Sequence, residues 1–209
     1  MPKKKRGEIF SIKQAYKDSF AFIKDSRNFI YSTILIFFIF CTIAFFFEEL
    51  VNSFFRLAFG FDLRNFILRT IRVLIEQTKD LSYFGLMKFI FINNLQSSFY
   101  GLVFGIFFSI FPIISIMFNG YLLGFVGLMS IKAEGILILW KILPHGIFEL
   151  PAIFISLGLG IRLGAYLFKK DKVPFRQIFI SSIKTFVLVV IPLLIIAAVI
   201  ETSLLFLTG

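Results

Sequence analysis

The sequence predicts an all-α integral membrane protein, a polytopic helical bundle with five transmembrane helices and amphipathic interfacial helices. Three observations support this. Hydrophobic residues make up 58% of the 209 residues, and phenylalanine occurs 32 times, which is more apolar surface than a water-soluble domain of this size buries. Five apolar runs reach or approach the roughly 20 helical residues that cross a hydrocarbon core about 30 Å thick. Basic residues stand mainly at the ends of these runs, as is usual in membrane proteins.

The chain divides into a basic cytoplasmic N-terminal segment, residues 1–28, and a single five-span membrane domain, residues 29–209. In the N-terminal segment, apolar residues recur every three or four positions between lysines, which indicates an amphipathic helix. Such a helix lies either on the membrane, against anionic headgroups, or on the cytoplasmic face of the protein itself. Its apolar stripe consists of Ile9, Ile12, Tyr16, Phe20 and Ile23.

The first span is predicted at residues 29–47, because the apolar run ends before Glu48 and Glu49. Residues 48–88 form an outer amphipathic segment in which apolar positions keep helical spacing. We expect one or two helices there, at the membrane interface or docked onto the bundle. The other spans are expected at residues 89–109, 112–131, 145–167 and 185–207.

Prolines mark the expected helix breaks, because proline cannot donate a backbone hydrogen bond. Residues 89–131 contain no charge, so a turn must divide this stretch, and Pro112 marks it. Pro144 suits the first turn of the fourth span, and Pro151 weakens that turn. Pro192 should kink the fifth span.

The distribution of positive charge predicts the orientation. With the N-terminus inside, the inner segments hold 14 Lys and Arg and the outer segments hold 8. We therefore expect a multi-pass protein of the cell membrane with a cytoplasmic N-terminus and an outer C-terminus. The basic residues form no nucleic-acid footprint, so the lipid bilayer, including its anionic headgroups, is the expected partner of these charges.

Glycines recur every fourth residue in three spans, a spacing that lets helix backbones approach closely. This predicts a tightly packed core of spans two, three and four, and self-association as a homodimer. Gly146, at the start of the fourth span, should also let another helix come close. The predicted packing glycines are Gly101, Gly105, Gly120, Gly124, Gly146, Gly160 and Gly164.

Polar side chains fall among these spans, and each costs free energy if it faces lipid. One interpretation is that interhelical hydrogen bonds hold the helices together. The other is a polar pocket for an ion or ligand, since ionisable residues at membrane depth are usually functional. The predicted cluster consists of Asn93, Asn119, His145 and Glu149.

Catalysis is the weaker interpretation of His145 and Glu149, although the spacing of four places them on one helix face. A zinc site needs three or four ligands, and the chain has one histidine, no HExxH motif and one distant cysteine, Cys41. A triad needs a nucleophile beside the base, and Ser156 lies two turns away. We therefore assign no catalytic residue, metal or cofactor.

The stretches NGYLLG, residues 119–124, and LPHGIFELPAIFISLGLGIRLG, residues 143–164, resemble the signature of the stage II sporulation protein M family. The resemblance implies a five-span membrane fold and no known catalytic activity. In spore formers the family's namesake anchors peptidoglycan-remodelling enzymes at the engulfing septum. The signature positions carried over are Asn119, Gly120, Pro144, His145, Gly146, Glu149 and Pro151.

Together these features favour a non-enzymatic membrane scaffold that recruits a protein partner, which the sequence does not identify. The alternative is a channel, transporter or lipid-handling protein that uses the polar site at His145 and Glu149. An intramembrane enzyme is the third hypothesis.

Overall fold

The computed structural model describes residues 11–168 and 173–208, except the side chains of residues 139–145 and 208. Every secondary-structure element in the described part of the chain is a helix, and none is a strand. Five of its helices are long and apolar enough to cross a membrane, which confirms the all-α, five-span prediction. These spans are Arg27–Phe59, Tyr83–Ile106, Ile110–Glu134, Gly146–Ala165 and Phe175–Leu207.

The elements follow one another with short connections, and three short 3₁₀ or π segments interrupt the α-helices. In chain order the elements are α1 (Ile12–Asp25), α2 (Arg27–Phe59), α3 (Leu63–Thr78), α4 (Tyr83–Val103), η1 (Phe104–Ile106), α5 (Ile110–Glu134), η2 (Ile136–Ile138), α6 (Leu139–Ala165), α7 (Phe175–Thr185), η3 (Phe186–Val190) and α8 (Ile191–Thr208).

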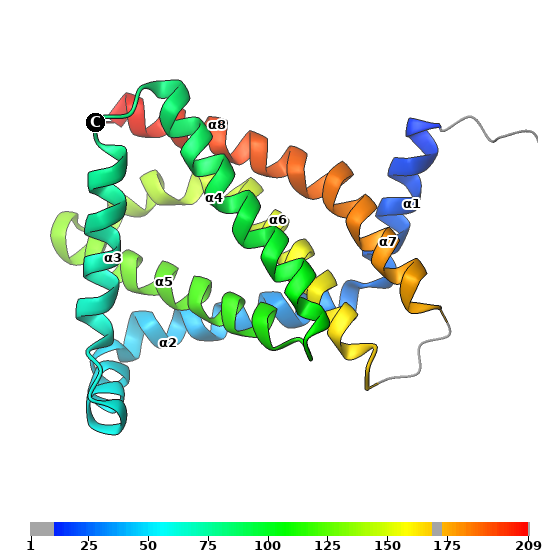
Figure 1. Cartoon of the computed structure of the whole chain (residues 1–209). Coiled ribbons are helices and arrows are strands. Elements are labelled where there is room, and N and C mark those ends of the chain that lie inside the picture. Colours follow the sequence, from blue (N-terminus) through cyan, green and yellow to red (C-terminus); the bar gives the residue numbers. More distant parts are fainter. Residues whose placement is uncertain (1–10, 169–172, 209) are drawn as a thin grey trace, which may run out of the picture.

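Helix α6 occupies the centre of the bundle and contacts α2, α4, α5 and α8. Helices α2 and α5 lie side by side along one edge and run in the same direction, whereas α4 and α8 form the other side (Figure 1). Helices α1 and α3 lie at opposite ends of this bundle, roughly across the spans (Figure 1). Four other spans therefore pack around α6.

Two glycine seams set the helix separations. On the first, Gly101 and Gly105 face Gly160 and Gly164 of α6. A Cβ atom added at Gly105 would overlap the carbonyl of Gly160, and one added at Gly160 would overlap the carbonyl of Gly101. The backbones of α4 and α6 are thus in direct contact, as small residues at a membrane helix interface allow.

The second seam joins α5 to α2 rather than to α4 or α6. Added Cβ atoms at Gly120 and Gly124 would overlap the carbonyls of Phe37 and Cys41. This differs from the expected core of spans two, three and four, because a glycine pair indicates a flat helix face without specifying its neighbour. By contrast, a Cβ at Gly146 would meet only Leu150 of its own helix, at an ordinary 3.5 Å.

The first span is longer than predicted. Helix α2 continues past the expected end at residue 47, with a kink at Phe47, and ends where Gly60 adopts a left-handed conformation. Glu48 does not end the helix, because its side chain is buried against Arg64 of α3. Glu48, the charge at the end of the apolar run, is therefore a contact point for α3 and not the end of α2.

Helix α3 is docked onto the bundle, which settles one alternative left open by the sequence. Arg64 donates two hydrogen bonds to Glu48, one of them from Nε to Oε1 at 2.7 Å, and its backbone N–H donates to Oδ1 of Asn52 at 3.0 Å. Asp62 caps the helix by accepting from the backbone N–H of Asn65 at 2.9 Å. This bond and the nearby Arg56 guanidinium hold the pKa of Asp62 below its usual value.

Helix α1 packs on α7 through small residues, not through its apolar stripe. Ala15 and Ser19 are buried, whereas Ile12, Tyr16 and Phe20 are exposed. The structure thus leaves most of the stripe free to contact the membrane, as expected for an interfacial helix. Ile9 of the predicted stripe lies outside the described residues.

Two predicted breaks need correction. The turn between the second and third spans falls at residues 107–109, where Phe108 and Ser109 have positive φ, and Pro112 lies in the first turn of α5. Such a position suits proline, because its missing N–H is not needed there. The fourth helix begins at Leu139, not at Pro144, so the helical backbone passes through Pro144.

The remaining two prolines behave differently from each other. Helix α6 continues through Pro151. In the fifth span, the π-helical segment η3 ends at Val190, immediately before α8 and Pro192. A π segment next to a proline is a usual way to absorb the missing hydrogen bond within a spanning helix. This span also starts earlier than predicted, because α7 continues into it from Phe175.

Candidate functional site

A groove of about 610 Å³ lies between α2, α5, α6 and α8. Among the described residues, three polar side chains line it, each from a different helix: Asn119 of α5, Glu149 of α6 and Glu201 of α8. The other described lining residues are apolar or glycine: Phe37, Leu122, Leu123, Val126, Gly146, Ile147, Leu150 and Ile153. We call this cavity the acidic groove.

Helix geometry explains how α6 contributes to the acidic groove. Gly146, Glu149, Leu150 and Ile153 are spaced by three, four and seven residues, which places them on one face. The same helix is held in position by its glycine seam with α4 and by Ser156, whose buried hydroxyl donates to the carbonyl of Ser98 at 2.6 Å. The carboxylate therefore projects from a rigid element.

Asn119 is positioned by the contact between α5 and α2. The neighbouring Gly120 brings α5 against the backbone of Phe37. The amide nitrogen of Asn119 donates to the carbonyl of Ser115 at 2.8 Å. The amide oxygen is a hydrogen-bond acceptor, and Asn119 lines the groove. The two carboxyl groups and this amide together offer several acceptor atoms to a cation or a hydrogen-bond donor.

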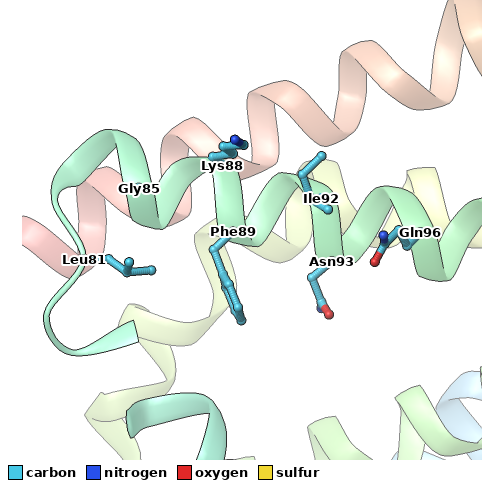
Figure 2. A pocket seen from close by; sticks show the side chains of 7 residues that line it. All are labelled: Leu81, Gly85, Lys88, Phe89, Ile92, Asn93 and Gln96. Carbon is cyan, nitrogen blue, oxygen red and sulfur yellow. The ribbon is translucent and has the colours of Figure 1, made fainter. Parts of the chain in front are cut away.

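The structure brings together only part of the predicted polar cluster. Asn119 and Glu149 share the acidic groove. Asn93 instead lines a separate pocket of about 460 Å³ on α4, with Lys88 and Gln96 (Figure 2). The side chain of His145 lies outside the described residues. The amide nitrogen of Asn119 donates to Ser115 of its own helix. Within the described residues, this nitrogen therefore does not join Asn119 to Glu149 by a hydrogen bond.

Sequence reasoning missed the contribution of Glu201 to this site. The available signal was a carboxyl group near the end of an apolar run, which is unusual enough to suggest function. The sequence did not show that Glu201 lies near Glu149, because this depends on the packing of α8 on α6 and α4.

Arg162 is a second polar residue whose role the sequence did not reveal. Its buried side chain donates to Oγ of Ser26 at 2.7 Å and forms an ion pair with Oδ2 of Asp25, also at 2.7 Å. The guanidinium lies 4.6 Å from the ring centroid of Phe22, a cation–π distance. Arg162 therefore fastens the corner between α1 and α2 to the end of α6.

Ser156 is not among the described residues that line the acidic groove. The Ser156 hydroxyl, the serine considered for a triad, is buried and hydrogen-bonded to a backbone carbonyl of α4. None of the described residues that line the acidic groove is basic. The described lining thus presents two carboxyl groups and an amide within a largely apolar cavity.

Comparison with known proteins agrees with the fold and the sequence pattern. The family model described as stage II sporulation protein M matches residues 30–204. An uncharacterised protein from Methanocaldococcus jannaschii is 37% identical over 134 residues, which cover 59% of this chain and 75% of that protein. No solved structure matches the chain. Because the family model matches well over half of the sequence, this five-span membrane protein belongs to the stage II sporulation protein M family.

Proposed function

We propose that the protein is a non-enzymatic membrane scaffold that recruits a partner protein within the bilayer. The acidic groove is the observation that carries this proposal. Ionisable side chains at membrane depth are costly unless they are paired or solvated. Glu149 and Glu201 share a mostly apolar cavity in which no described lining residue is basic. A partner's transmembrane helix bearing a lysine or arginine would supply both a positive charge and an apolar surface.

The rest of the molecule is consistent with a rigid docking platform. Glycine seams bring α4 against α6 and α5 against α2. The two amphipathic helices are fastened at opposite ends, α1 through Arg162 and α3 through Glu48. The family is not known for catalysis, and the membrane-anchor role of its namesake supports the same proposal.

Photo-crosslinking from Ile147 tests this proposal. Ile147 lines the acidic groove, and 65% of its surface is exposed, so a photoreactive residue there can reach an occupant. In native membranes we expect an adduct of defined mass that contains a second, different protein. Glu149→Leu should reduce its yield about tenfold, because losing one charged hydrogen-bonded pair costs on the order of 1.5–3 kcal/mol.

Ile114 provides the matched control, because it lies on the exposed surface of α5 and lines a different pocket. A photoreactive residue there should not give the same protein adduct. If position 147 yields only lipid adducts, the scaffold proposal is contradicted and the lipid-handling alternative is favoured. An adduct containing only two copies of this chain also contradicts it.

We further propose that the N-terminus is cytoplasmic and the C-terminus is outside. The supporting observation is the excess of Lys and Arg in the segments that this orientation places inside. A single cysteine replacing Leu57, which is exposed near the end of α2, should react with an impermeant maleimide in intact cells when Cys41 is replaced by serine. A cysteine at Phe20 should react only after permeabilisation, and the reverse pattern would reject this orientation.

A further inference from the structure

Helix α4 presents an unusual exposed stripe. Phe89, Asn93, Gln96, Tyr100 and Val103 follow one another at spacings of four and three residues. Asn93, Gln96 and Tyr100 are exposed, and the other two are partly exposed. Figure 2 shows Phe89 and Asn93 projecting from the same side of the helix. This stripe lies apart from Ser98 and Leu102, which α4 buries against the rest of the bundle.

The two amides of this stripe lie deep in the membrane. The span runs over 24 residues from Tyr83, and a rise of about 1.5 Å per residue places Asn93 and Gln96 roughly 15–20 Å from its start. Water is absent at this depth, so exposed amides need partners that lipid tails cannot supply. Within the described residues, neither of these side chains makes a hydrogen bond, although both have donor and acceptor atoms.

The spacing indicates what covers the stripe. Alternation of four and three residues averages 3.5, the repeat of a seam between two helices that cross at a small angle. A primary amide is both a donor and an acceptor, so the same residue on two identical helices can pair with itself. An asparagine within such a seam favours a two-stranded arrangement, and a two-fold interface requires such a self-complementary surface.

We propose that α4 is the interface of a homodimer, in which the amides of Asn93 and Gln96 pair across a two-fold axis with those of a second copy. The pocket of about 460 Å³ beside Gly85 and Phe89 receives side chains of the partner helix. This inference is independent of the acidic groove, which lies on other helices. It also differs from a glycine interface, because the glycine pairs of α4, α5 and α6 are occupied within the chain.

Lys88 lies beside the stripe and suggests the competing occupant. It lines the same pocket, and a lysine beside two amides could also bind a phospholipid headgroup. The helical rotation of about 100° per residue places Lys88 roughly 80° from Gln96, on the flank of the seam. Two copies can therefore meet along the stripe without bringing their lysines together, which favours the protein occupant.

Cysteine crosslinking in membranes tests the interface on the full chain. The native Cys41 is first replaced by serine, and single cysteines are then placed at Gln96 and at Phe84. Phe84 is also on α4 and is 73% exposed, but lies on another side. We expect a short bifunctional maleimide to link two chains through position 96 and not through position 84. Equal linkage at both positions, or none at position 96, overturns the proposal.

A second experiment removes the side-chain amides of Asn93 and Gln96 by substitution. The double variant Asn93→Val, Gln96→Leu should still insert, since it makes the span more apolar. We expect its dimer dissociation constant in liposomes, measured by single-molecule photobleaching during lipid dilution, to rise at least about tenfold. Phe84→Ala should leave the constant unchanged. An unaltered constant for the double variant, or a monomeric wild type that retains phospholipid lost on Lys88→Ala, overturns the dimer.

Discussion

Arg64→Ala should lower the free energy of unfolding by about 3–5 kcal/mol, because it leaves a buried carboxylate without its partner. Glu48 is only 2% exposed and accepts two hydrogen bonds from the Arg64 guanidinium. Removing the arginine therefore strands a charge between α2 and α3. We also expect α3 to detach, so that limited proteolysis cuts the connection at residues 60–62.

Arg72 offers a matched control on the same helix, because its side chain is exposed. Arg72→Ala should change the free energy of unfolding by less than about 0.5 kcal/mol, as is usual for surface substitutions. Both free energies of unfolding are measured by reversible SDS titration, with circular dichroism as the readout. The double variant Glu48→Leu, Arg64→Leu should regain much of the lost stability, since it buries no charge. Equal effects of Arg64→Ala and Arg72→Ala would contradict the docking role.

Gly160→Ala should strongly destabilise the packing of α6 on α4. Its Cβ would overlap the backbone carbonyl of Gly101, and backbone cannot move aside as a flexible side chain can. Overpacking of this kind costs about 1–3 kcal/mol, and separation of α4 from α6 would also disturb the hydrogen bond between Ser156 and Ser98. The same SDS titration measures the loss.

Gly146→Ala is the control on the same helix. Its Cβ would meet only Leu150, at 3.5 Å, so the substitution adds no overlap. Alanine favours a helix over glycine by about 1 kcal/mol at either position, which means that the difference between the two variants isolates the packing term. If both variants are equally stable, the α4–α6 seam does not depend on backbone contact.

Much of the fold could be predicted from run length and charge. Apolar runs of about 20 residues identified five spans, because backbone hydrogen bonds within lipid must be satisfied inside a helix. Element ends were less predictable. Helix α2 runs 12 residues beyond its predicted end, to Phe59, because Glu48 is neutralised by a residue from a different helix. Pro112 lies close to the turn between the second and third spans, but the turn itself falls at residues 107–109, where the sequence contains no proline or glycine.

The candidate site was predictable only in its individual residues. Asn119 and Glu149 stood out as polar side chains in apolar spans, whereas Asn93 stood out equally and faces a different pocket. Spacing reports which residues share a face of one helix. It does not report which faces of different helices meet, and for this reason Glu201 was not placed beside Glu149.

The sequence by itself determined that this protein is an all-α membrane bundle of the stage II sporulation protein M type, because hydrophobicity, helical periodicity and motif are properties of local sequence. Only the tertiary structure decided that Gly120 meets α2, that Arg162 fastens α1 to α6, and that LPHGIFELPA directs Glu149 into a groove shared with Glu201. These contacts join residues far apart in the chain. They depend on which helices pack against one another, because close packing leaves room for only a few neighbours. No single segment of the sequence specifies those neighbours.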